Sequence, residues 1–256
     1  MMSCATGKQM AYNHYRQGEL MKILIIAATH GNELLGTKLI GHIITKRPEL
    51  LEYLDFIIGN PRAYAKRVRY IESDLNRSYS LGDNTYEQRR ANEIERYITT
   101  MKPDLVLDMH TTTCAEPPIM IVKDTVNSTV RRYLRNCHIE KVLQVTTEND
   151  GAGITPKFVA YEVMSRAVKP ALLEAICDDI QKYIDDTSSH ATKQVYKMAG
   201  KLYKADVSAA QLKTFINFEA HPLGFVPIMV GERAYRQQTD YVGFKADLPD
   251  VLEISR

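Results

Sequence analysis

Short apolar runs alternate with amphipathic stretches as far as about residue 190, and this alternation limits the fold more than any other feature. Apolar runs occupy residues 22–27, 54–58, 105–109, 119–122 and 159–164. Between them, residues 34–44, 86–101, 126–137 and 171–184 carry apolar side chains at helical spacing. Strands that alternate with helices in this way build a mainly parallel sheet with helices on both faces. We therefore predict an α/β fold with a mixed, mainly parallel sheet.

The chain changes character at both ends. Residues 1–20 show no clear periodicity, and we predict a poorly structured N-terminal extension. The codons for Gly18 to Leu20 can resemble a bacterial ribosome-binding site, so translation is hypothesised to start at Met21. We predict an α/β domain over residues 21–190. Residues 193–256 contain short β-prone pieces and no long helical pattern, which predicts a small β-rich C-terminal domain.

Charge and hydropathy exclude several classes of partner. The chain of 256 residues has 33 basic and 31 acidic side chains, a net charge of +2, which gives no electrostatic reason to bind nucleic acid or an anionic membrane. No apolar run approaches the roughly 20 residues of a membrane span, and no secretory signal is visible. The four cysteines form no C-x-x-C pair, as expected of reduced thiols. These features predict a cytoplasmic protein and leave homo-oligomer formation open.

Three candidate metal ligands lie at the ends of predicted strands. His30 and Glu33 follow the first apolar run, and His110 ends the run that begins at Leu105. The carboxyl ends of parallel strands share one edge of a sheet, where ligands bind. Two histidines and one glutamate are the protein ligands of a catalytic zinc. The H-x-x-E spacing occurs often by chance, so the pattern alone supports zinc only weakly. Asp108 could orient a ligand from behind.

A basic loop follows the second predicted strand. Arg62, Asn76 and Arg77 fall there, on the same expected sheet edge as the metal candidates. In isolation such a loop is typical of a solvated surface. Beside a metal, arginine can bind a carboxylate with two parallel hydrogen bonds or stabilise an oxyanion. We therefore interpret these residues as substrate-binding or catalytic.

Several motifs together resemble one known family. The segments Ala28–Glu33, Asn60–Ala63, Asp74–Arg77 and Asp108–Thr112 are similar, in order and spacing, to motifs of the aspartoacylase/succinylglutamate desuccinylase family. The segments Tyr161–Val163 and Val226–Tyr235 extend the resemblance, which covers about residues 21–245. Each motif is short, and the combination makes the match specific.

The resemblance implies an enzyme that hydrolyses the amide bond of an N-acyl amino acid. It implies a zinc-carboxypeptidase-like domain with a β-rich domain that caps the site. One Zn²⁺ per chain would be held by His30, Glu33 and His110. Glu162 matches the catalytic glutamate, and Arg62 matches the arginine that polarises the amide carbonyl. The residues that match substrate-binding positions are Asn76, Arg77 and Tyr235. The expected partner is a small N-acyl amino acid.

The match weakens where aspartoacylases bind the substrate's side-chain carboxylate. Those enzymes carry an arginine about ten residues before the catalytic glutamate, near residue 152 here. Residues 149–157 contain no arginine, and Lys157 is their only cation. A lysine does not reproduce the two-pronged contact of an arginine. The metal candidates are unaffected, but acyl-aspartate specificity is left open, as are the acyl group, the amino acid and the metal used in the cell.

Two other classes of function remain. A metallocarboxypeptidase or peptidoglycan peptidase could use the same scaffold, although a capping C-terminal domain would exclude long peptides. A non-enzymatic member could bind a metal or a ligand. The presence of Glu162 and Arg62 beside the metal candidates argues against pure binding, because binding needs no general base.

Overall fold

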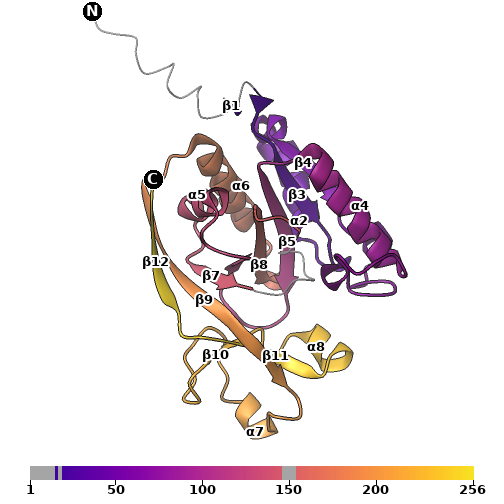
Figure 1. Cartoon of the computed structure of the whole chain (residues 1–256), viewed down its shortest axis with the longest axis vertical. Coiled ribbons are helices and arrows are strands. Elements are labelled where there is room, and N and C mark those ends of the chain that lie inside the picture. The colour runs from indigo at the N-terminus through magenta and orange to yellow at the C-terminus, as the bar shows by residue number, and fades with distance from the viewer. Residues whose placement is uncertain (1–14, 17–18, 146–153) are drawn as a thin grey trace, which may run out of the picture.

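A mixed sheet of ten strands forms the centre of the protein (Figure 1). The structure is a computed structural model that describes residues 15–16, 19–145 and 154–256. The strand order is β10-β11-β9-β7-β6-β8-β5-β3-β4, and β12 pairs with β9. The strands are β3 (Ile23–Ala27), β4 (Leu54–Ile58), β5 (Leu105–Thr112), β6 (Ile119–Val122), β7 (Lys141–Gln144), β8 (Phe158–Met164), β9 (His190–Tyr203), β10 (Val226–Ile228), β11 (Tyr241–Ala246) and β12 (Asp250–Ser255).

The predicted parallel arrangement is confirmed through most of this sheet. Strand β3 runs parallel to β4 and β5, β5 to β8, β6 to β7, and β7 to β9. Strand β6 is antiparallel to β8. Antiparallel pairing also joins β9, β10, β11 and β12 in the β-rich C-terminal part. As a result, the carboxyl ends of β3, β5 and β8 lie at one edge of the sheet.

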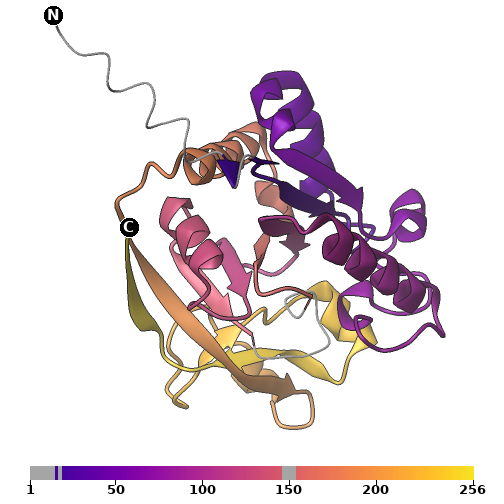
Figure 2. The same ribbon diagram turned by 45° about the horizontal axis from the view of Figure 1, so that its top comes forward.

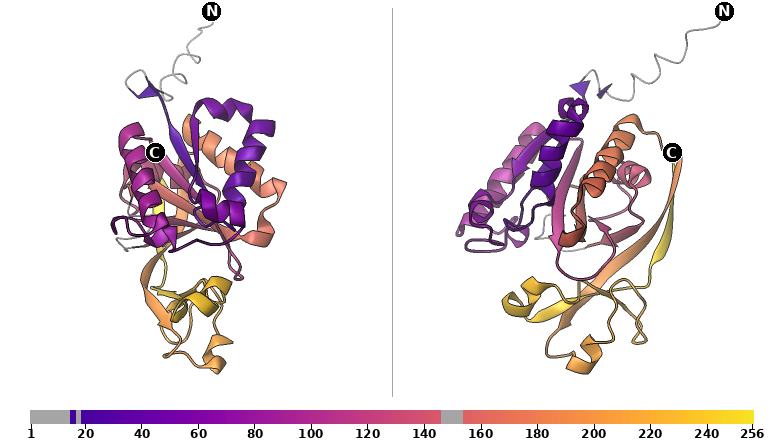
Figure 3. Two further views of the ribbon diagram at one scale, coloured as in Figure 1. Left: turned by 90° about the vertical axis from the view of Figure 1, so that its right-hand side faces the viewer. Right: turned by 180° about the vertical axis from the view of Figure 1, so that it is seen from behind.

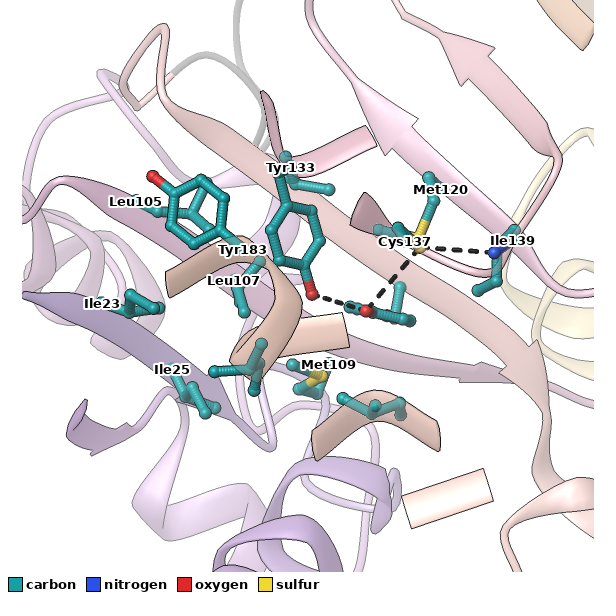
Figure 4. Close-up of a cluster of buried hydrophobic side chains, with 14 of the residues drawn as sticks. Ile23, Ile25, Leu105, Leu107, Met109, Met120, Tyr133, Cys137, Ile139 and Tyr183 are labelled. Atoms are coloured by element: carbon teal, nitrogen blue, oxygen red, sulfur yellow. Dashed lines mark hydrogen bonds between the residues drawn. The ribbon is translucent and has the colours of Figure 1, made fainter. Parts of the chain in front are cut away.

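Helices cover both faces of the sheet (Figure 3). On one face, α2 (Leu35–Lys46), α5 (Ser128–Asn136) and α6 (Pro170–Asp185) pack on apolar side chains of β3 and β5 (Figure 4). On the other face, α4 (Tyr86–Met101) buries Ala91, Ile94 and Ile98. A capping box at Thr85 and Gln88 begins α4, because each side chain binds the other's backbone N–H. The 3₁₀ turns η2 (Pro48–Glu52) and η5 (Ser165–Ala167) connect elements.

The basic loop after β4 is more ordered than its sequence suggests. It contains the helix α3 (Pro61–Lys66) and the 3₁₀ helix η3 (Leu75–Arg77). The buried Glu87 of α4 accepts hydrogen bonds from the Asn60 side chain and from the backbone N–H groups of Ile71, Glu72 and Ser73. A single carboxylate therefore anchors the loop and fixes where η3 approaches the sheet.

One strand belongs to both parts of the molecule. Strand β9 has 14 residues; its first half pairs with β7 and β12, and its second half pairs with β11 (Figure 2). It begins at the expected domain boundary and continues the same sheet. The short helices α7 (Ala209–Leu212) and α8 (Arg233–Gln238) accompany β10 and β11. The division at residues 190–193 therefore remains a prediction.

The N-terminal prediction is addressed only in part. The strands β1 (Tyr15–Arg16) and β2 (Glu19–Leu20) form a separate antiparallel pair. The other positions before Glu19 lie outside the described residues. The same holds for residues 146–153, which include most of the segment in which the family's additional arginine was sought.

Candidate active site

The three predicted metal ligands meet at the carboxyl edge of the sheet. Glu33 places Oε1 2.6 Å from Nδ1 of His30 and Oε2 3.0 Å from Nδ1 of His110. One donor atom from each residue lies within 4.8 Å of the other two, and all three side chains are buried. His30 and Glu33 occupy the junction between β3 and α2, whereas His110 lies on β5. The parallel pairing of β3 with β5 brings these distant segments together.

Two further carboxylates hold the histidines from behind. Asp74 Oδ1 lies 3.0 Å from Nε2 of His30, and Asp108 Oδ2 lies 2.9 Å from Nε2 of His110. The hydroxyl of Thr29 donates to Asp108 at 2.8 Å and fixes it in turn. With a metal ion bound, an Nε2–H donated to each outer carboxylate would leave Nδ1 of each histidine available as a ligand beside Glu33. This donor set and its supporting carboxylates fit a zinc site.

The electrostatics of Glu33 follow from its neighbours. Burial favours the neutral carboxyl, but the charges of His30 and His110 outweigh burial and hold the pKa of Glu33 well below its ordinary value. The backbone N–H of Thr111 also donates to Glu33 at 3.0 Å. An ionised carboxylate therefore lies between the two histidines.

A cavity of about 470 Å³ opens beside these three residues. Its polar lining is His30, Glu33, Arg69, Asn76, Arg77, His110, Thr111, Thr112, Glu162, Lys201, Glu232 and Tyr235. Its apolar lining is Ile121, Leu143, Val145, Phe158, Ala160, Met198, Met229 and Phe244. Side chains from the expected C-terminal region thus complete a cavity that begins at β3 and β5.

Glu162 lies next to the metal candidates on β8. Its strand partner on β5 is His110, and it lines the cavity. Burial raises the pKa of Glu162 well above its ordinary value, and the negative charge of Glu33 raises it further. Among the described residues, none donates a hydrogen bond to the side-chain carboxyl of Glu162. A buried carboxyl that faces a cavity without a protein partner is suited to proton transfer.

Asn76, Arg77 and Tyr235 reach the same cavity. Asn76 and Arg77 belong to η3, where the Asp74 side chain caps the turn by accepting from the N–H of Asn76. Tyr235 lies on α8, and its ring packs 4.9 Å from that of Tyr241, centroid to centroid. All three line the cavity. The structure therefore brings together the residues predicted to bind substrate.

Arg62 is not brought into this cavity. Its side chain is exposed, and its guanidinium lies 4.3 Å above the centre of the Tyr86 ring. Arg62 is in the first turn of α3, which begins at the Asn60 cap, and it is not among the residues that line the cavity. Arg69 lines the cavity instead, 3.0 Å from Asp74 and 3.6 Å from Glu33. The cavity is therefore approached by the predicted loop, but through Arg69 and not through Arg62.

Glu232 is a buried side chain of the site that the sequence analysis did not select. It accepts hydrogen bonds from both the N–H and the hydroxyl of Thr113, at 2.6 and 2.9 Å, and from the hydroxyl of Thr112 at 2.7 Å. Burial alone would raise the pKa of Glu232, but hydrogen bonds, led by that from the Thr113 N–H, lower it. Glu232 joins the C-terminal part to the segment after His110. The position of Glu232 within the Val226–Tyr235 motif was the sequence feature that could have identified it.

Lys157, the only cation in residues 149–157, does not line the cavity. Its Nζ lies 3.4 Å from the carbonyl oxygen of Pro103.

Residues 19–173 match the succinylglutamate desuccinylase/aspartoacylase catalytic domain family. The match covers more than half of the chain and includes the three metal candidates and Glu162. The chain belongs to this family. Among curated relatives, a probable aspartoacylase of Prochlorococcus marinus (strain MIT 9515) is 45% identical over 106 residues, 36% of this chain and 34% of that protein. Aspartoacylase of Mus musculus is 36% identical over 137 residues, 46% of this chain and 44% of that protein.

These alignments span only about a third to less than half of the relatives' lengths. Solved structures match over more of the chain. Murine aminoacylase 3 superposes with a TM-score of 0.67 at 18% identity, covering 92% of this chain and 97% of that chain. Succinylglutamate desuccinylase from Chromobacterium violaceum gives a TM-score of 0.66 at 16% identity, covering 91% and 85%. At such identities the likeness establishes the fold. Within the described ranges, no helix is both long and apolar enough to span a membrane.

Proposed function

We propose that this protein hydrolyses the amide bond of an N-acyl amino acid with the help of one zinc ion. The observation that carries the proposal is the shared cavity of His30, Glu33, His110 and Glu162. The outer carboxylates Asp74 and Asp108 support it, because they orient both histidines for metal binding. Family membership supports the reaction class.

His30, Glu33 and His110 would hold the metal. When bound, zinc supplies a Lewis acid that lowers the pKa of a water molecule and polarises a carbonyl group. The residues around it perform the remaining tasks. The backbone N–H of Thr111 and the ring contacts of both histidines keep Glu33 in one orientation.

Glu162 moves the proton. Its carboxylate accepts a proton from the attacking water and transfers that proton to the amine nitrogen as the amide bond breaks. General acid–base catalysis of this kind contributes roughly 10²–10⁴-fold to a rate. The place of Glu162 across from His110 puts it beside the metal candidates without making it one of them.

Arg69 takes the role that the sequence analysis gave to Arg62. Its guanidinium lies 3.6 Å from the candidate ligand Glu33 and donates two hydrogen bonds, of 3.2 and 3.0 Å, to Asp74. A fixed cation at this position stabilises negative charge that develops on the carbonyl oxygen. Arg62 stacks on Tyr86 and does not line the cavity, so we do not assign this task to it.

Asn76 and Arg77 bind the α-carboxylate of the amino acid, and Tyr235 packs over it from the C-terminal part. Tyr235 of α8 and Phe244 of β11 line the cavity on that side, and a wall there favours a small substrate over a long peptide. Cys114, Cys137 and Cys177 are buried free thiols, which supports the proposed location in a reducing compartment such as the cytoplasm.

The test is a panel of N-acetyl, N-formyl and N-succinyl amino acids, with short C-terminal peptides included, incubated with zinc-loaded protein. Release of a free amino acid from one N-acyl compound is expected. Glu162→Gln should lower kcat by about 10²–10⁴-fold, Arg69→Met should also lower kcat, and Arg62→Met should change it little. Hydrolysis of peptides alone would support the carboxypeptidase alternative. Zinc binding with no turnover would support a non-enzymatic role.

A further inference from the structure

The walls of the active-site cavity differ in chemistry from one end to the other. Arg69, Asn76 and Arg77 approach from the loop after β4, and Asp74 in that loop contacts His30. Beyond Glu162 the lining changes to apolar side chains from β8, β6, β7 and β9. We call this the apolar wall; its members are Ile121, Leu143, Val145, Phe158, Ala160 and Met198.

The sheet order explains why the two kinds of lining separate. From β5, the neighbouring strands are β8, β6, β7 and β9 in that sequence, leading away from β3 and its loop. Ala160 lies two residues before Glu162 on β8, so both side chains face the cavity. Ile121 pairs with Ala160 and also with Leu143. Because adjacent strands lie about 4.8 Å apart, the apolar wall begins beside Glu162 and extends across several strands.

Among the described residues, the charged side chains that line the cavity lie outside the apolar wall. Lys201 is exposed, and its Nζ lies 4.8 Å above the centre of the Tyr241 ring, after Met198 along β9. Among the described residues of the apolar wall, none is charged or carries a hydrogen-bonding side chain. A second carboxylate on the substrate, placed against this wall, would lose its hydration without gaining a partner.

We propose that the apolar wall binds the acyl group of the substrate, and that this group is uncharged, apolar and longer than acetyl. The proposal rests on the proposed function, in which Asn76 and Arg77 bind the α-carboxylate. The scissile amide then lies beside Glu162, and the acyl chain continues toward Ile121 and Met198. At roughly 30 Å³ per water-sized group, a cavity of about 470 Å³ exceeds what an N-acetylated small amino acid fills.

The experiment varies the acyl group on a constant amino acid. N-acetyl-, N-butanoyl-, N-hexanoyl- and N-succinyl-alanine are compared with the zinc-loaded full chain, together with N-acetyl-leucine. We expect kcat/KM to rise about fourfold for each added methylene that is buried, and N-succinyl-alanine to fall below N-butanoyl-alanine. A gain for N-acetyl-leucine without any gain from acyl length would overturn the assignment of the wall to the acyl group.

Binding to a variant that does not turn over separates this proposal from the proposed reaction. Calorimetry with zinc-loaded Glu162→Gln should show Kd decreasing from the acetyl to the hexanoyl compound. Tighter binding of longer chains without hydrolysis by the wild type would refute the reaction and retain the acyl site. The acyl site would be overturned if kcat/KM and affinity stayed constant or decreased as the acyl chain lengthens. The absence of any binding would overturn it as well.

A charge on the wall should reverse the preference. Met198 is only partly buried, so Met198→Arg can be accommodated. We expect this variant to lose its preference for N-hexanoyl-alanine and to turn over N-succinyl-alanine at least about tenfold better, since a desolvated carboxylate gains a partner. Met198→Leu should keep the original preference. Ala199→Arg is the matched control, because it adds the same charge at the neighbouring exposed position. An unchanged ratio in Met198→Arg would refute the proposal.

Discussion

Strand β8 separates two groups of residues that both have the side chains of a metal site; all of them are buried except His138, which is exposed. On the cavity face are His30, Glu33 and His110; on the opposite face are Cys137, His138 and Asp179. On β8 itself, Glu162 faces the first group and its neighbour Tyr161 faces the second. Adjacent side chains on a strand point to opposite faces. The two groups therefore allow a direct comparison of similar residues in different surroundings.

In the group on the opposite face, the atoms that could bind a metal already take part in hydrogen bonds. Asp179 accepts from the N–H of His138 at 2.9 Å and from the hydroxyl of Tyr161 at 2.8 Å, and its carboxylate lies 2.7 Å from Nδ1 of His138. Cys137 Sγ accepts from the N–H of Ile139 (Figure 4), and burial raises the pKa of its thiol. The ammonium of Lys193 donates to the carbonyl oxygens of Cys137 and Ile139.

The comparison shows that donor type and proximity do not by themselves define a metal site. The cavity-face group points its donors at one another beside open space, and further carboxylates hold it from behind. The other group forms a closed hydrogen-bond network with a cation next to it. We interpret the first as functional and the second as structural.

The largest difference is expected in metal content. Purified wild-type protein should contain one zinc ion per chain, and His110→Ala should lose it. The loss of affinity should exceed the roughly 10–100-fold cost of removing an outer carboxylate, because a direct ligand is absent. His138→Ala, the matched change in the other group, should keep the zinc. Elemental analysis after dialysis decides, and loss of zinc in both variants would invalidate the comparison.

The free energy of unfolding should depend more on the group of Cys137, His138 and Asp179 than on the metal candidates. Asp179→Asn replaces a buried acceptor with an amide whose N–H₂ faces two donors, so we expect unfolding to be easier by about 3 kcal/mol. Urea unfolding at constant pH measures this, and kcat should remain near wild type. Tyr161→Phe should cost less, about 1 kcal/mol. An Asp179→Asn protein with normal stability and reduced turnover would show that this network serves catalysis.

Glu116 provides a pH-dependent case. Its Oε1 is buried without a hydrogen-bond partner among the described residues, and burial raises its pKa to about 7 from an ordinary 4.5. Below pH 4.5 the folded and unfolded chains are both protonated there. As the pH rises toward 7 the unfolded chain loses this proton first, so stability falls by about 3 kcal/mol.

The control variant for this prediction is Glu116→Gln, which cannot titrate. The difference in unfolding free energy between Glu116→Gln and wild type should increase between pH 4.5 and 7 in favour of the variant, and then level off. Denaturation curves at several pH values provide the measurement. A difference that stays constant with pH would show that Glu116 is ionised in the folded protein.

The smallest expected change concerns the support of the metal ligands. Asp108→Asn removes the charge behind His110 but keeps the size of the side chain. Zinc affinity should fall about 10–100-fold, as measured by competition with a chromophoric chelator. Asp179→Asn should leave zinc affinity unchanged. Equal affinities for Asp108→Asn and wild type would mean that Nε2 of His110 needs no negative partner.

Local sequence patterns were sufficient to predict the strand and helix alternation and the metal candidates. The apolar runs that became β3 and β5 are buried and continuous, and the ligands follow directly in the chain. Arg62 and Arg69 could not be distinguished this way, because both lie in one polar loop. The position of this loop depends on the local cap at Asn60 and on the anchoring of Asn60 by Glu87, and the second of these is a tertiary contact.

The apolar wall was also beyond local patterns. The antiparallel pairing of β6 with β8 sets Ile121 opposite Ala160, and no property of either segment specifies that register. The importance of Glu232 depends on contact with Thr112 and Thr113, more than a hundred residues earlier in the chain. The length of β9 was missed because its exposed polar positions obscure a strand that has partners on both edges.

The continuity of β9 has a consequence for how such a protein can change its substrate. The first half of β9 pairs with β7 and β12, and its second half pairs with β11. The C-terminal part therefore cannot be exchanged as a separate module without cutting this strand. A crossover near residue 196 would cut a strand that is paired on both edges. Substrate preference in this scaffold is therefore expected to diverge by replacement of single side chains along the wall, with the main chain conserved as a common frame.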